Sequence, residues 1–181
     1  MLRKAKLILA CSACVFLLVS VPLSQGADAN GAIPSEIQNA SVSSDFEFRI
    51  HKGRFLVRRK GTSQWKRCSE MTEPIIVGVL DGDRRVYLVT KAVTPPKPLH
   101  AEDPTYPDNW RKMRVPGELS VHFVVDNQGV VRFPKVDEST APEFAAAALD
   151  AVKTWRFQPA NLNGQSVAVL VVATTTFRIE S

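Results

Sequence analysis

An α+β fold is predicted by three features of the C-terminal half of the chain. Apolar residues alternate with other residues over 119–125 and return over 130–136, which is typical of two antiparallel strands. Between 144 and 155 the apolar residues repeat at helical spacing, and 167–179 is predicted to be a long strand that is apolar on both faces over its first half. Apolar residues make up 45% of the 181 residues and charged residues 23%, so the chain can form a hydrophobic core.

The first 29 residues have the plan of a secretory signal peptide. A basic head at Arg3, Lys4 and Lys6 precedes an uncharged run over 7–23, and the small residues at 27–29 suit signal peptidase. The alternative is an uncleaved anchor, because 17 uncharged residues are at the lower limit for crossing a bilayer. We therefore expect export, with membrane anchoring as the alternative.

Cys68 is the thiol that stays after cleavage, because Cys11 and Cys14 lie in the leader. Three Cys and three His are too few for a disulfide-rich scaffold or a multi-metal protein. Thiols usually pair in an oxidising compartment. A buried, inert thiol is the simpler expectation for Cys68. The alternative is an intermolecular disulfide, and a homodimer stays among the expected assemblies.

Residues 30–92 are expected to form a flexible leader over 30–44 and a small β-hairpin module over 45–92. Small and polar residues fill the leader. In the module, alternating residues flank a turn at His51–Gly53, and Asp81-Gly82 separates a second pair of apolar runs. Fewer than 50 residues give marginal stability, so we expect the module to lean on the rest of the chain or on a partner.

The stretch from Arg49 to Arg67 holds eight Lys or Arg and no acidic residue. A solvated strand face is the simpler interpretation. The functional alternative is attraction to an anionic surface such as anionic lipid, lipopolysaccharide or peptidoglycan. Nucleic acid is not an expected partner of an exported protein. The candidate residues for this surface are Arg49, Lys52, Arg54, Arg58, Arg59 and Lys60.

Residues 93–107 contain five prolines and are expected to form a stiff, extended linker before the domain over 108–181. A short helix is predicted over 107–115. Pro134 indicates that its strand lies at an edge or carries a bulge. The run Thr140–Glu143 has the pattern of a capping box at the start of the Ala-rich helix.

No catalytic or cofactor-binding constellation is present. The three His are scattered, and the sequence has no His-Glu-x-x-His motif, no Gly-x-Ser-x-Gly motif and, after cleavage, no Cys-x-x-Cys motif. His122 alternates with core positions and is expected to point outward. Trp65, Trp110 and Trp155 are expected to pack. We therefore expect a protein that is not an enzyme and has no cofactor or metal.

The C-terminal part resembles a known family over about residues 98–180. The matching motifs are Tyr106-Pro107, Val121–Asp126 with Gly129 and Val131, Ala147–Val152, Trp155-Arg-Phe-Gln-Pro-Ala160, and Asn163-Gly164. In this order and spacing they are similar to the C-terminal domain of TonB, the energy transducer of Gram-negative bacteria. The resemblance implies two helices packed on a three-stranded antiparallel sheet, here preceded by the small β module.

The resemblance also implies a function by contact in the periplasm. Members of this family bind an extended segment of an outer-membrane receptor, which adds as a strand to a sheet edge during transport across the outer membrane. A receptor or another envelope protein is therefore the expected partner. The implied partner-binding residues are Tyr106, Pro107, Val167, Val169, Leu170, Val171, Val172, Ala173, Thr175 and Phe177.

Two departures argue against a complete energy transducer. The apolar run over 7–23 has no His or acidic residue, although a polar group is the expected mark of coupling within a membrane. The stiff stretch over 92–104 spans at most roughly 45 Å, at ~3.5 Å per residue, which is short for crossing the periplasm. We therefore expect a TonB-like periplasmic interaction domain. The alternative is an envelope-surface binding module that uses the basic stretch.

Overall fold

The computed structural model describes residues 45–178 and the backbone of residues 6–8. The remainder of the predicted signal peptide and the leader over 30–44 lie outside the described residues. The strands are β1 (Lys6–Ile8), β2 (Phe46–His51), β3 (Arg54–Arg59), β4 (Lys66–Arg67), β5 (Ile76–Leu80), β6 (Arg84–Leu88), β7 (Lys97–His100), β8 (Gly117–Val125), β9 (Val131–Ser139), β10 (Arg156–Gln158), β11 (Ala160–Leu162) and β12 (Gln165–Phe177). The helices are α1 (Asp108–Lys112) and α2 (Pro142–Thr154), with a 3-10 turn at Cys68–Glu70.

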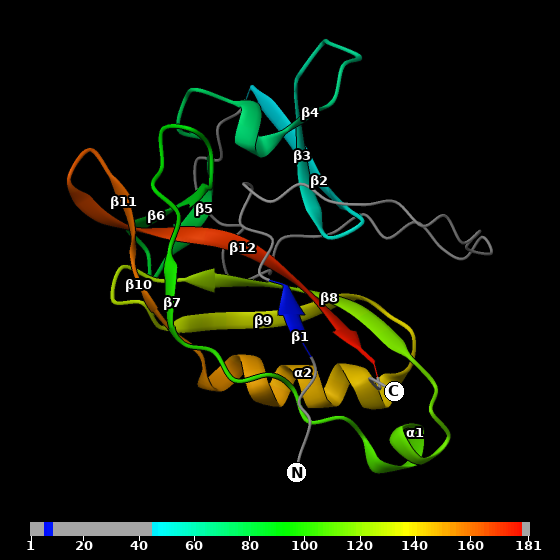
Figure 1. The fold of residues 1–181 in the computed structure, drawn as a ribbon. Coiled ribbons are helices and arrows are strands. Elements are labelled where there is room, and N and C mark those ends of the chain that lie inside the picture. The colour runs from blue at the N-terminus through cyan, green and yellow to red at the C-terminus, as the bar shows by residue number, and fades with distance from the viewer. Residues whose placement is uncertain (1–5, 9–44, 179–181) are drawn as a thin grey trace.

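The main sheet has the strand order β5-β6-β12-β8-β9 (Figure 1). β12 pairs antiparallel with β8, and β8 pairs antiparallel with β9, so these three strands form an antiparallel unit. β6 pairs with the other side of β12 and runs parallel to it. The molecule is therefore α+β, and its central sheet is wider than the three antiparallel strands that the resemblance implies.

Two buried clusters fill the two faces of this sheet. One face carries Phe123 and Val171, which pack with Phe144 and Trp155 from α2 and its C-terminal end. Figure 1 shows α2 along this face and the β2–β3 hairpin on the other. On that second face, a smaller cluster joins residues of β2, β3, β5 and β6 to Val124, Ala168 and Leu170. The sheet is thus covered on both sides, which explains why the sequence of β12 is apolar on both faces.

The two N-terminal hairpins lie in different sheets. β2, β3 and β4 form a separate three-stranded sheet, whereas the β5–β6 hairpin extends the main sheet. The single antiparallel module expected over 45–92 is therefore divided. The physical reason is that Val86 and Leu88 are fully buried only when β6 lies beside β12. The hairpin finds its neighbours in the C-terminal domain, which supplies the support that a module of this size needs.

The proline-rich segment is extended, as predicted, but it is packed against the C-terminal domain. β7 pairs with β10, and the backbone amides of Thr94 and Asn161 exchange hydrogen bonds of 2.8 and 3.0 Å with each other's carbonyl groups. Trp155 Nε1 also donates to the Glu102 carbonyl oxygen at 2.9 Å. This segment is a layer of the domain and does not act as a spacer.

The start of α2 differs from the predicted capping box. The N-cap residue is Ala141, and no side chain caps the helix. The Thr140 hydroxyl instead accepts from the Glu118 amide and donates to the Glu118 carbonyl oxygen, both at 2.9 Å. Pro142 occupies the first turn, where a missing N–H costs nothing because that group has no partner inside the helix. Thr140 therefore joins α2 to β8.

The position of Pro134 is confirmed. β9 is an edge strand, and its register with β8 shifts between the pairs His122–Lys135 and Val124–Arg132. Phe133 in this bulge has φ +50°. A bulge and a proline both make the edge of β9 a poor template for another strand.

The expected outward position of His122 is wrong. His122 is 1% exposed, and its Nδ1 donates to Asp137 Oδ1 at 2.5 Å. The alternation correctly predicts that its side chain faces away from α2. That face is covered, however, since the β2–β3 turn lies over it and a Cβ on Gly53 would lie 2.3 Å from Thr174 Oγ1. Alternation along one strand contains no information about such a second layer.

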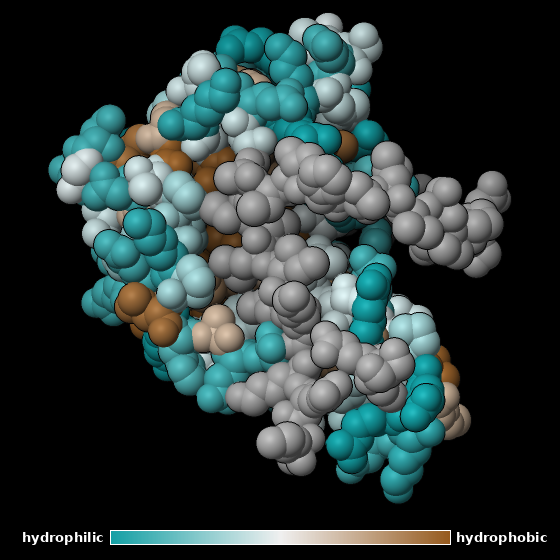
Figure 2. All heavy atoms as spheres, viewed as in Figure 1, coloured by the Kyte–Doolittle hydropathy of each residue, from teal (hydrophilic) through white to brown (hydrophobic). Residues whose placement is uncertain are grey.

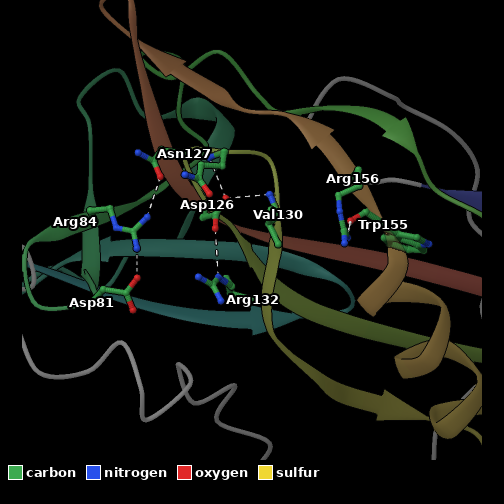
Figure 3. Close-up of polar contacts among 9 residues, drawn as sticks. Asp81, Arg84, Asp126, Asn127, Val130, Arg132, Trp155 and Arg156 are labelled. Carbon is green, nitrogen blue, oxygen red and sulfur yellow. Dashed lines mark hydrogen bonds and ion pairs between the residues drawn. The ribbon is translucent and has the colours of Figure 1, made fainter.

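The turn between β8 and β9 is held by a buried carboxylate (Figure 3). Asp126 is 1% exposed, and its Oδ1 accepts from the amides of Gln128 and Val130, each at 2.9 Å. Its Oδ2 accepts from Arg132 Nε at 3.2 Å. Gly129 closes the turn with φ +80°, and a Cβ there would lie 1.8 Å from the Phe157 carbonyl oxygen. The turn therefore requires both residues.

We predict that Asp126→Ala lowers the free energy of unfolding by about 2–3 kcal/mol, because two backbone amides lose their acceptor. Asp126→Asn keeps the shape of the side chain and one acceptor oxygen, and should lower the free energy of unfolding by about half as much. Urea denaturation followed by tryptophan fluorescence measures both, with the buried Trp155 as reporter. Equal losses for the two variants would show that the carboxylate does not stabilise the turn through these amides.

A second prediction compares two glycines with nearly the same backbone. Gly61 has φ +81°, and a Cβ there meets nothing within 4 Å. Gly61→Ala should therefore lower the free energy of unfolding by only about 1 kcal/mol, which is the cost of placing alanine in the left-handed conformation. Gly129→Ala should cost at least about 2 kcal/mol more, because its methyl group collides with the Phe157 backbone. The same denaturation experiment tests this, and indistinguishable stabilities would contradict the steric argument.

Candidate protein-binding edge

β12 is the strand that the sequence singles out, and its two sides are occupied differently. Along one side, all residues from Val169 to Phe177 pair with β8. Along the other side, Ala168–Leu170 pair with β6 and Thr174–Thr176 pair with β1. Val167 pairs with Ala160 of β11. The predicted binding strand is thus central in the sheet over much of its length.

The stretch from Val171 to Ala173 is the gap in this pairing. Among the described residues, no strand pairs with it on the side away from β8. The antiparallel pairing of β1 with the next three residues shows that the backbone geometry there accepts a strand. Apart from β1, none of the described strands pairs with the stretch from Val171 to Phe177 on this side.

The residues along this edge are buried. Val171, Val172, Ala173, Thr175 and Phe177 are each at most 6% exposed. Val171, Ala173 and Phe177 belong to the cluster that contacts α2. These fractions refer to whole residues, so the backbone of this stretch is buried along with the side chains.

Tyr106 packs against the end of β12. Its ring makes edge contacts with Phe144 and Phe177, at centroid distances of 5.8 and 5.4 Å. Its hydroxyl donates to the Val115 carbonyl oxygen at 2.5 Å, and burial raises the pKa of the phenol. Pro107, the N-cap residue of α1, is half-buried. Tyr106 therefore packs against the end of β12 and is 8% exposed.

A polar clamp keeps the β5–β6 hairpin at the other end of β12 (Figure 3). Arg84 donates through Nη1 to Asn127 Oδ1 at 3.0 Å, and its Nη2 is paired with Asp81. Asn127 lies in the turn that Asp126 holds. This clamp joins the first residue of β6 to the β8–β9 turn, so that β6 stays on β12 and ends the accessible edge at Leu170.

The structure divides the predicted basic residues. Arg58 pairs with Glu47 at 2.6 Å, and Arg59 pairs with Glu73 at 3.0 Å while lying over the Phe46 ring. Arg49 and Arg54 are exposed on their strands, Lys52 lies in the β2–β3 turn, and Lys60 follows β3. The six residues therefore do not form one continuous patch.

Sequence analysis missed a buried polar group next to the edge. His122 Nε2, Asp137 Oδ2 and Ser120 Oγ have no hydrogen-bond partner among the described residues. Ser120 and His122 are opposite Thr174 and Val172 in the ladder between β8 and β12. Asp137 comes from β9, and no motif spacing connects it to His122. Only the strand register brings the two together.

The remaining chemistry of the described part is limited. Cys68 is buried, which confirms the expectation of a buried thiol, and burial raises its pKa to about 12. No group of three or more His, Cys, Asp or Glu that could hold a metal ion occurs within the described ranges. No helix among the described residues is long and apolar enough to cross a membrane.

Comparison with known proteins places the C-terminal part in a family. Residues 102–179 match the family of the Gram-negative bacterial TonB protein C-terminal domain. The solution NMR structure of the Pseudomonas aeruginosa TonB C-terminal domain is 25% identical, with a TM-score of 0.37, and the match covers 50% of this chain and 87% of that chain. No curated protein matches the chain. The family model thus confirms the resemblance carried by the sequence motifs: residues 102–179 match the TonB C-terminal family.

Proposed function

We propose that this protein is a periplasmic, non-catalytic adaptor that binds an extended segment of an outer-membrane receptor or another envelope protein. The observation that carries the proposal is the gap in the pairing of β12, where Val171–Ala173 have a strand neighbour only on the β8 side among the described residues. Family membership supports an interaction domain in the envelope of a Gram-negative bacterium. A role in TonB-dependent transport is part of the proposal.

The partner is proposed to add as one strand between the end of β6 and the end of β12. β6 occupies Ala168–Leu170, so Val169 and Leu170 have strand neighbours on both sides. A guest strand therefore begins at Val171 and extends to Phe177. Backbone hydrogen bonds supply most of the affinity in this mode, and side-chain pockets supply selectivity. Because the β12 side chains are buried, selectivity has to come from groups beside the strand.

The N-terminal strand β1 affects whether a partner strand can pair with this edge of β12. β1 lies within the predicted signal peptide and pairs with Thr174–Thr176. Removal of the signal peptide would take away this neighbour, and none of the other described strands pairs with residues 171–177 on that side. Processing and partner binding are therefore linked in the proposal.

The test is backbone hydrogen exchange on protein purified from the periplasm, with its N-terminus determined by mass spectrometry. The probe is a synthetic heptapeptide from the periplasm-facing end of an outer-membrane receptor of the same organism. We expect exchange of those amides over 171–177 that point away from β8 to slow by about tenfold or more, because a guest strand protects them. Amides on the outer edge of β9 should not change.

The matched control is the same peptide with alternate backbone nitrogens methylated, which removes donors without changing the side chains. It should give no protection. The proposal is overturned if the methylated peptide protects the same amides equally, or if protection appears on β5 or β9 instead.

A further inference from the structure

The β2–β3–β4 sheet has one face that carries arginines from all three strands. Directly opposed residues of antiparallel strands point to the same face. The register opposes Glu47 to Arg58, His51 to Arg54, and Leu56 to both Arg49 and Arg67. We call this the arginine face, and it consists of Glu47, Arg49, His51, Arg54, Leu56, Arg58 and Arg67. The other face contributes Phe46 and Val57 to the buried cluster against the main sheet.

Trp65 organises the middle of the arginine face. The guanidinium carbons of Arg49 and Arg58 lie 4.4 and 4.8 Å from the centre of its ring. Cation–π contacts at this distance hold the planar guanidinium groups in place. Arg58 also pairs with Glu47. Two arginines from neighbouring strands are thus positioned before any ligand arrives, which lowers the entropy lost on binding.

The arginine face has excess positive charge and free donors. It carries four arginines and one acidic residue, Glu47. Arg49, Arg54 and Arg67 are exposed, and none of them forms an ion pair with an acid in the described part of the chain. Figure 2 shows mostly hydrophilic residues at the end of the molecule where Figure 1 places β3 and β4. The solvated donors of these three arginines are available to an anion.

We propose that the arginine face binds phosphate-bearing lipid headgroups at a membrane surface. Guanidinium groups form bidentate hydrogen bonds with phosphate oxygens. A tryptophan beside a flat basic face is typical of proteins that sit at a membrane–water interface. Each Lys or Arg near an anionic membrane adds attraction, and Lys52 and Lys60 lie in the β2–β3 turn and directly after β3.

This proposal does not depend on the function proposed for β12. The arginine face belongs to the β2–β3–β4 sheet, and the edge over 171–177 belongs to the main sheet. Figure 1 places β4 at the end of the molecule opposite α1 and α2. Membrane attachment through one sheet would leave the other sheet in the aqueous phase.

The experiment is co-sedimentation of protein purified from the periplasm with vesicles of four compositions. These are phosphatidylcholine alone, phosphatidylcholine with phosphatidylglycerol, phosphatidylcholine with lipid A, and phosphatidylcholine with a carboxylate lipid at matched surface charge. We expect binding to the phosphatidylglycerol or the lipid A vesicles, at least fivefold weaker binding to the carboxylate vesicles, and loss of binding as salt is raised. The two phosphate arms identify the source of the phosphate.

Two double variants with the same change in net charge distinguish binding through the arginine face from binding that depends only on the net charge of the protein. Arg54→Glu with Arg67→Glu changes the arginine face without touching Trp65. Lys97→Glu with Lys112→Glu changes exposed residues of β7 and α1. The first pair should weaken vesicle binding at least tenfold, and the second pair should leave it within about twofold. Circular dichroism checks that both variants are folded.

The proposal is overturned by any of three results. The two double variants lose binding equally, which indicates unspecific charge. The carboxylate vesicles bind as well as the phosphate vesicles. The protein sediments with purified peptidoglycan but with none of the vesicles, which would make a cell-wall polymer the ligand.

Discussion

β12 is hydrogen-bonded to β8 over nine residue pairs and to β6 over three, so both halves of the chain are built onto one strand. Its side chains fill two separate cores, one against α2 and one against the N-terminal hairpins. A strand that is buried on both faces needs apolar residues on both, and β12 is apolar without interruption from Val167 to Ala173. Over Val171–Ala173, none of the described strands pairs with β12 on the side away from β8.

The local elements of the C-terminal domain were predictable because their signals lie within a few residues of each other. Alternation located β8, helical spacing located α2, and Pro134 located the bulge in β9. The predictions failed where a distant segment decides the outcome. Thr140 has the chemistry of a cap, but Glu118 takes its hydroxyl. His122 has the alternation of an exposed residue, but the hairpin over Gly53 covers that face.

For the candidate sites as well, short motifs could be recognised in the sequence, whereas contacts between distant segments could not. The motifs around Trp155 were sufficient to recognise the family, yet they contain nothing about β6, which limits the usable edge of β12. The basic stretch was visible as composition, but the sequence does not show which arginines share a face. The strand register and the position of Trp65 decide that, and they separate Arg49 and Arg58 from Arg59.

The parallel pairing between β6 and β12 has a consequence for how the protein is made. Val86 pairs with Ala168, about 80 residues later in the chain. A polypeptide that is synthesised from its N-terminus therefore carries the hairpin with one unpaired side until residues 168–170 have been made. Contacts this distant slow folding and leave an exposed template for aggregation in the meantime. Formation of the N-terminal half is thus coupled to the arrival of β12, and a chain that stops before Ala168 would lack the strand that β6 pairs with.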